Sequence, residues 1–254
     1  MNLFRSVAFM LGSALWTMIF GTLVVLAILG PLLLRFRIIW YYRRGFMWMT
    51  EHILGITHEL RGRENLPKEP SVMLSKHQSA WETVALQDVV PEGTYCVFVL
   101  KKELLKLPFF GWGLAALQMI SIDRAAGREA LNEVVVQGAD RLKRGFWIII
   151  FPEGTRGAPG KTLRYKQGGA YLASHTGAKV VPIAHNAGEC WPRNAFIKRP
   201  GHVVISIGPA IETAGLSQEE VNTRTEAWIE GEMRHLSPHR YPDAATKSSS
   251  PAAA

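Results

Sequence analysis

The stretch SVMLSKHQSAWET, residues 71–83, changes from a strand pattern to a helix pattern within a few residues. Its first half is a short apolar run, which is typical of a buried strand. Its second half contains Ser79-x-x-Glu82, the spacing of a capping box, in which two side chains bind free backbone N–H groups at a helix start. A strand that leads directly into a helix predicts helices packed on a sheet.

His77 lies between these two patterns, five positions ahead of Glu82. Residues five apart do not face each other on one helix, so the two side chains can meet only if His77 precedes the helix and Glu82 lies in its first turn. In that arrangement the carboxylate holds one ring nitrogen while the other nitrogen acts as a general base. Taken alone, the pattern favours a helix cap over a catalytic pair.

The same alternation of strand and helix patterns continues along the chain. Helical spacing of apolar residues is clearest at 128–144, which Gly145 follows, and a second helix is predicted after Ser217. The predicted fold class is α/β: a mixed sheet covered by helices, with an N-terminal membrane-inserted helical anchor. Further apolar runs rich in β-branched residues predict strands at 94–100, 119–123, 146–151, 179–184 and 202–208.

The N-terminal segment has no charged residue from Val7 to Leu34. A bilayer core about 30 Å thick takes roughly 20 apolar helical residues, so this segment is long enough to span it. Its length exceeds the apolar part of a signal peptide, about 7–15 residues, which argues against cleavage. Gly30-Pro31 ends or kinks the first helix, and residues 38–56 mix aromatic and charged residues as interfacial helices do. Two arrangements stay open: one span with a surface helix, or a hairpin that enters one leaflet.

Charge predicts the orientation of the anchor. One arginine precedes the apolar segment, and four arginines follow it closely. By the positive-inside rule, we expect the rest of the chain to lie in the cytoplasm, at the inner membrane. The net charge of +8 suits an anionic leaflet or anionic substrates. We expect no nucleic-acid partner, because no nucleic-acid-binding module accompanies that charge. The expected division is an anchor at residues 1–60, a cytoplasmic domain at 61–240 and a disordered tail at 241–254.

A second polar motif, FPEGTR at residues 151–156, directly follows a very apolar strand. Gly154 permits an unusual backbone angle, and Arg156 offers a forked, permanently charged set of donors. Backbone N–H groups beside an arginine suit a phosphate. The alternative is an ordinary surface turn, in which Glu153 and Arg156 are solvated.

A third group of charges stands at two other strand ends. Lys101 and Lys102 end one strand, and Asp123 and Arg124 end another. The alternative to a binding role is that these are solvated charges, with a local ion pair that contributes little. No metal site is predicted, because the histidines lack paired ligand spacing.

In this order, the motifs resemble the bacterial lysophosphatidate (1-acylglycerol-3-phosphate) acyltransferases and their wider glycerolipid acyltransferase superfamily. HQSAWE is similar to the family's His-x4-Asp motif, and LKKELLKLPFFG with ISIDR to its second block. FPEGTR matches the third block almost letter for letter, and VVPIAHN is similar to the fourth. The resemblance extends over about residues 3–208.

The resemblance implies a membrane-bound enzyme that makes phosphatidic acid. His77 would deprotonate the sn-2 hydroxyl of lysophosphatidic acid, which then attacks an acyl thioester on coenzyme A or acyl carrier protein. Glu82 would orient His77 and stabilise its charge. No metal or bound cofactor is implied, since the thioester is a consumed substrate. The implied substrate contacts are Lys101, Arg156 and Arg124 for the phosphate, Glu153, Gly154 and Thr155 for the acceptor site, and Pro182 for the acyl-donor side.

Two positions depart from the family pattern. The family usually has aspartate where this chain has Glu82, and asparagine where it has Lys76. Glutamate is one methylene longer, so its contact with the histidine must be built from a different position. The departure leaves open another acceptor such as a lyso-ornithine lipid, or thioester hydrolysis. A non-catalytic membrane-binding protein is the alternative from another class, and it leaves the combination of His77 with FPEGTR unexplained.

Overall fold

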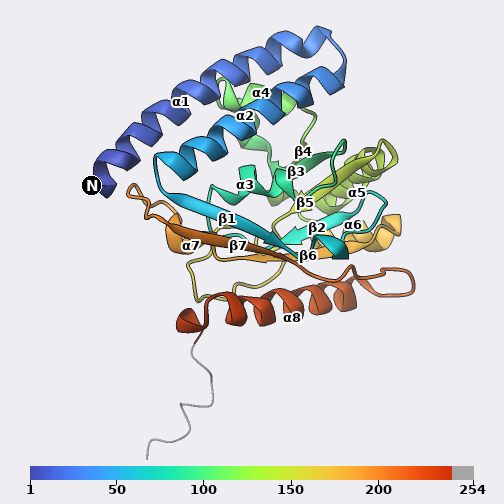
Figure 1. The fold of residues 1–254 in the computed structure, drawn as a ribbon. Helices are drawn as coiled ribbons and strands as arrows, with labels where there is room; N and C mark the ends of the chain where they lie inside the picture. Colours follow the sequence, from blue (N-terminus) through green and yellow to red (C-terminus); the bar gives the residue numbers. More distant parts are fainter. Residues whose placement is uncertain (242–254) are drawn as a thin grey trace, which may run out of the picture.

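The computed structural model describes residues 1–241, without the side chain of Arg124. It has the predicted α/β architecture, a mixed sheet with helices on both faces (Figure 1). The strands are β1 (Ile56–Arg61), β2 (Val72–Ser75), β3 (Tyr95–Lys101), β4 (Ile120–Ile122), β5 (Phe146–Ile150), β6 (Val180–His185) and β7 (Gly201–Ile207). The helices are α1 (Asn2–Leu26), α2 (Leu32–His52), α3 (Glu82–Ala85), α4 (Phe110–Ala116), α5 (Arg128–Lys143), α6 (Gly168–Thr176), α7 (Ala187–Cys190) and α8 (Gln218–Leu236).

The sheet has seven strands in the order β1-β7-β6-β2-β5-β3-β4. Every neighbouring pair is parallel except β6 with β7. In β2, Val72 and Leu74 join the core on one face, and Met73 joins the core on the other. Strands covered on both faces read as continuous apolar runs, which explains why FWIII shows no polar alternation.

The strand β1 was not predicted, because its sequence, ITHELR, is largely polar. It lies at the edge of the sheet, and among residues 1–241 its one partner strand is β7, in parallel. Gly55, with a φ of 73°, turns the chain out of α2 and into this strand. A polar edge strand carries a weak local signal, since its pairing partner lies far along the chain.

The N-terminal helices α1 and α2 form an antiparallel hairpin over one side of the sheet (Figure 1). The predicted break is at Gly30-Pro31, where Pro31 caps α2. The 28 residues from Asn2 to Leu29 are long and apolar enough to cross a membrane, and only 11% of their most apolar stretch is buried. The hairpin also packs onto the core of the sheet, through Phe9 and Phe46. The boundary at residue 60 stays a prediction, and residues 242–254 of the expected tail lie outside the described residues.

Three central strands position the candidate site. Because β2 is parallel to both β5 and β6, the carboxyl ends of all three meet at one edge of the sheet. KHQSAWET follows β2, FPEGTR follows β5, and His185 ends β6. Helix α8 covers the opposite face of the sheet from α1 and α2 (Figure 1). Polar residues from distant parts of the sequence are therefore gathered at the middle of the molecule.

Candidate active site

The turn after β2 holds His77 and Glu82 together. His77 precedes α3, and Glu82 is the first residue of that helix. The Nδ1 atom of His77 lies 2.7 Å from Oε1 of Glu82. The same carboxylate accepts the backbone N–H of Gln78 at 2.9 Å and that of Ser79 at 2.7 Å. One glutamate therefore serves both the helix start and the histidine.

The predicted capping box at Ser79 is only half formed. Glu82 binds the Ser79 N–H, but the Ser79 hydroxyl accepts from the N–H of Trp81 at 3.1 Å, and α3 has no side-chain cap. The prediction that the helix starts at Ser79 is wrong. The turn that carries His77 continues through residues 79–81, and α3 begins at Glu82. A complete capping box is present in α8, between Ser217 and Glu220.

Glu82 is fully buried and is surrounded by hydrogen-bond donors. Burial raises the pKa of Glu82 to about 7, against the attraction of His185 and the hydrogen bonds from the backbone of Gln78 and Ser79. Burial also lowers the pKa of His185, whose Nε2 donates to the carbonyl of Lys76 at 2.8 Å and lies 3.8 Å from Glu82. Glu82 is thus a buried carboxyl group that His77 and two backbone N–H groups contact and that His185 lies beside, and burial outweighs these contacts in its pKa.

Contacts with the FPEGTR turn and with Gly157 after it hold the ring and the backbone of His77 in place. The imidazole ring stacks on Phe151 with centroids 3.9 Å apart and planes 15° apart. The His77 N–H donates to Oε2 of Glu153 at 2.7 Å, and the His77 carbonyl accepts from the N–H of Gly157 at 2.8 Å. The side chain is 14% exposed, so the ring can reach a substrate without being surrounded by water.

A cavity of about 500 Å³ opens beside His77, between the N-terminal hairpin and the sheet. The lining includes three basic side chains, Lys101, Arg156 and Arg193. Most of the other lining side chains are apolar; they include Phe20, Val24, Phe36, Phe98, Leu100, Leu117 and Met119. The cavity therefore combines basic groups with a largely apolar wall, and His77 is part of its lining.

Several predicted site residues meet at this cavity. Gly154, Thr155 and Arg156 line it together with His77, and so does Lys101, which also pairs with the exposed Glu103 at 3.1 Å. Gly154 has a φ of 66°, the left-handed conformation that glycine allows.

Other predicted site residues lie elsewhere. Glu153 is only 3% exposed and turns its carboxylate toward Lys76 and the His77 N–H. Pro182 is buried within β6, and its carbonyl accepts from the N–H of Gly208. Arg124 begins a short 3-10 turn, and its side chain is outside the described residues.

The structure adds residues that the sequence did not single out. His185 was considered only as a metal ligand, yet it lies beside Glu82, and the described residues contain no cluster that could hold a metal. Arg193 joins the basic side chains of the cavity through its bond to the Arg156 carbonyl at 3.1 Å. Lys76 was visible as a departure from the family pattern, but its burial was not. The sequence carried no signal for its partner Glu230.

A histidine–carboxylate pair at a strand end, facing a basic and apolar cavity, defines the class of glycerolipid acyltransferases that the sequence resembles. The family model "Acyltransferase" matches residues 57–186. A 1-acyl-sn-glycerol-3-phosphate acyltransferase of Pseudomonas aeruginosa is 42% identical over 239 residues, 92% of each chain. The enzyme of that name from Saccharomyces cerevisiae is 29% identical over 72% of this chain and 60% of its own length.

A solved structure supports the same assignment. The crystal structure of the 1-acyl-sn-glycerophosphate (LPA) acyltransferase from Thermotoga maritima superposes with a TM-score of 0.75 at 25% identity, over 92% of this chain and 95% of that one. The chain therefore belongs to the acyltransferase family, in its 1-acyl-sn-glycerol-3-phosphate acyltransferase branch.

Proposed function

We propose that the protein transfers an acyl chain from an acyl thioester to the sn-2 hydroxyl of lysophosphatidic acid and so forms phosphatidic acid. The observation that carries the proposal is the His77–Glu82 pair, 2.7 Å apart, beside a cavity lined by basic and apolar side chains. An acceptor with a phosphate suits the basic side chains of that lining, and a donor with an acyl chain suits the apolar ones.

The proposed reaction uses His77 as the general base. With Nδ1–H donating to Glu82, Nε2 takes the proton of the acceptor hydroxyl as that oxygen attacks the thioester carbonyl. The new ester C–O bond forms, the C–S bond breaks, and the proton passes from the imidazolium to the departing thiolate. Glu82 holds the imidazole in the productive tautomer and stabilises the imidazolium that forms transiently.

In the proposal, the basic side chains of the cavity bind the acceptor phosphate and the apolar side chains bind the acyl chain. Arg156 and Lys101 hold the acceptor phosphate, where the guanidinium can bind two oxygens at once. Arg193 adds a third cation to the same lining. The acyl chain lies against the apolar side chains, where its burial from water favours binding. The donor thiol carrier, coenzyme A or acyl carrier protein, stays outside in solvent.

Membrane attachment follows from the difference between the two substrates. The acceptor lipid resides in a leaflet, whereas the thioester is soluble, so the enzyme works at the interface. In this proposal α1, which is long and apolar enough to cross a membrane, serves as the anchor. The arginines after it favour a cytoplasmic position of the catalytic part, at the inner membrane, by the positive-inside rule.

A lysolipid panel tests the function. Purified protein in mixed micelles is given a labelled acyl donor, either acyl-CoA or acylated acyl carrier protein. The acceptor is lysophosphatidic acid, lyso-ornithine lipid or none. We expect phosphatidic acid to form, and His77→Ala to lower kcat by about 10²–10⁴-fold. The matched control is His175→Ala, an exposed histidine in α6 outside the cavity. Release of free fatty acid alone, or preference for lyso-ornithine lipid, would overturn the proposed acceptor.

A further inference from the structure

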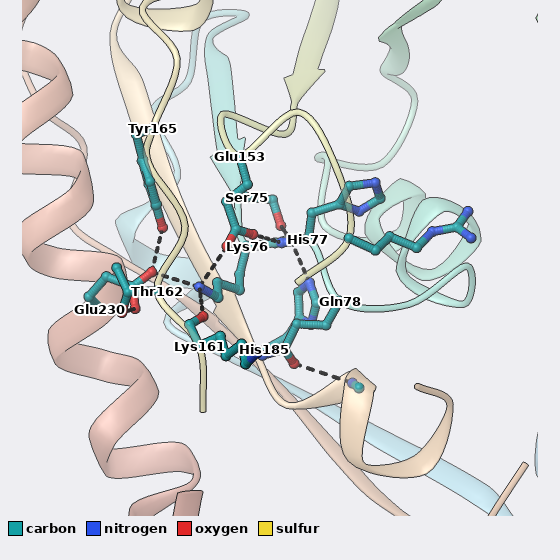
Figure 2. A network of polar contacts seen from close by, with 12 residues as sticks. Ser75, Lys76, His77, Gln78, Glu153, Lys161, Thr162, Tyr165, His185 and Glu230 are labelled. Carbon is teal, nitrogen blue, oxygen red and sulfur yellow. Dashed lines mark hydrogen bonds and ion pairs between the residues drawn. The ribbon is translucent and has the colours of Figure 1, made fainter. Parts of the chain in front are cut away.

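Lys76 is completely buried next to the catalytic histidine, at the centre of a polar network (Figure 2). Its ammonium donates to Oε1 of Glu153 at 2.8 Å, Oε1 of Glu230 at 2.7 Å and the carbonyl of Lys161 at 3.3 Å. Each of the three N–H bonds of the ammonium thus has an acceptor. Burial opposes the charge, but the attraction and hydrogen bonds of the two carboxylates outweigh it and raise the pKa of Lys76.

The acceptors of Lys76 lead to different parts of the active site. Glu153 accepts the His77 N–H with its second oxygen, at 2.7 Å. Glu230 projects from α8 and accepts the hydroxyls of Thr162 and Tyr165, at 2.7 and 3.0 Å. Those hydroxyls belong to the return loop, residues 157–166, which follows FPEGTR (Figure 2). Lys76 therefore joins the backbone of the base to the loop beside Arg156.

The two ends of the return loop are also tied down. Its first N–H, from Gly157, donates to the His77 carbonyl at 2.8 Å. Its last N–H, from Lys166, donates to the carbonyl of Pro152, also at 2.8 Å. Between these two bonds, Glu230 and Lys76 supply polar contacts to the loop, and the Tyr165 ring packs in the core with Ala184, Ile229 and Met233.

Burying such a network contributes little net stability. Ions lose several kcal/mol of hydration on burial, and well-packed apolar side chains are often as stable or more so. A lysine with two buried carboxylates is therefore poorly explained by stability alone. Its geometry favours another role, since every bond connects a piece of the site to a fixed element.

We propose that Lys76 and Glu230 are positioning residues, which hold the general base and the phosphate-binding turn in fixed register during acyl transfer. The proposal rests on the proposed function and adds to it a requirement for α8. Neither side chain lines the cavity beside His77. A displacement of about 1 Å between reacting groups can lower a rate about 10²-fold, so a loosened network slows chemistry even when both substrates still bind.

The test compares two variants that differ in charge balance. Lys76→Met leaves the carboxylates of Glu153 and Glu230 with no cation, whereas Lys76→Met with Glu230→Gln restores the original network charge of −1. The wild-type sum is +1 for the lysine and −2 for the two glutamates; the double variant has −1 from Glu153 alone. The control is Glu232→Gln, which changes a carboxylate of α8 that binds Ser206 at 2.7 Å instead.

Three quantities are measured on each variant: the unfolding temperature, kcat and KM in the transfer assay, and amide hydrogen exchange of residues 75–82. We expect the double variant to unfold at a higher temperature than Lys76→Met, while both show kcat lowered about ten- to hundredfold and faster exchange at His77. KM should change by less than about threefold. The Glu232→Gln control should match the wild type in kcat and exchange.

The outcomes separate the two proposals. If kcat recovers in the double variant together with the unfolding temperature, the network is only structural and the inference fails. Unchanged exchange at His77 in both variants also overturns it. A wild-type protein without transfer to any lysolipid would refute the proposed function instead, and the exchange data would still decide whether Lys76 holds the backbone of His77.

Discussion

The substitution Glu82→Gln separates the two roles of that side chain. Both carboxylate oxygens accept from N–H donors: Oε1 from His77 and Gln78, and Oε2 from Ser79. An amide has only one acceptor oxygen. If that oxygen stays with His77, its NH2 group faces the Ser79 N–H; if it turns to Ser79, the NH2 group faces His77 and favours the wrong imidazole tautomer.

The effect on stability can be worked from the same contacts. Raising the pKa of Glu82 from 4.5 to about 7 means that ionising it in the folded state costs about 3 kcal/mol above pH 7. The amide removes that cost and leaves one buried backbone N–H without an acceptor, which costs about 1–3 kcal/mol. The two terms oppose each other. We therefore expect the free energy of unfolding at pH 8 to change by less than about 2 kcal/mol.

The effect on catalysis has no such compensation. The amide carries no charge to stabilise the imidazolium, so kcat should fall by about 10²–10⁴-fold, the range for general acid–base catalysis. The assay is the initial rate of acyl transfer to lysophosphatidic acid in mixed micelles at pH 8. The control is Glu220→Gln, since Glu220 completes the capping box of α8 without a histidine partner. Retention by Glu82→Gln of more than about a tenth of the wild-type kcat would refute the role of a charged partner.

The pH dependence of stability gives an independent check. A carboxyl whose pKa is raised on folding stabilises the protein below its unfolded pKa and loses that contribution as the pH rises through its folded pKa. For Glu82 the window runs from pH 4.5 to about 7. Denaturant unfolding of the wild type should therefore show a loss of about 3 kcal/mol across this window that Glu82→Gln lacks. Equal slopes for the two proteins would contradict the buried charge.

Further substitutions probe the substrate contacts and the cavity. Arg156→Ala should raise the KM for lysophosphatidic acid roughly tenfold or more, since a hydrogen-bonded charge contributes about 1.5–3 kcal/mol; an unchanged KM would argue against phosphate binding. Gly154→Ala should lower the unfolding temperature by several degrees, because a φ of 66° costs a side chain about 1–2 kcal/mol. Gly21→Val should alter the preferred acyl length in a donor series, because a Cβ there would lie 2.7 Å from the Phe109 carbonyl oxygen and push α4 away from α1. The value of kcat/KM should increase with pH, because loss of a proton creates the active form. The midpoint of that increase is an apparent pKa of the histidine–glutamate pair and not of either residue alone.

Local patterns in the sequence were enough to predict much of the fold. The apolar runs at 94–100 and 146–151 became β3 and β5, and the helical spacing at 128–144 became α5. The resemblance carried by FPEGTR and HQSAWE predicted the family. These signals succeed because strand and helix periods, caps and turn residues act between near neighbours.

Tertiary structure decided what depends on distant residues. The polar strand β1 exists only because β7, some 145 residues away, pairs with it. Whether Glu82 contacts the helix start or His77 was open in the sequence, and the path of the turn lets it contact both. The burial of Lys76 against Glu230 joins positions 154 residues apart. Spacing along the chain carries no information about such a contact, since only the packing of α8 against β6 sets the distance between the two charges.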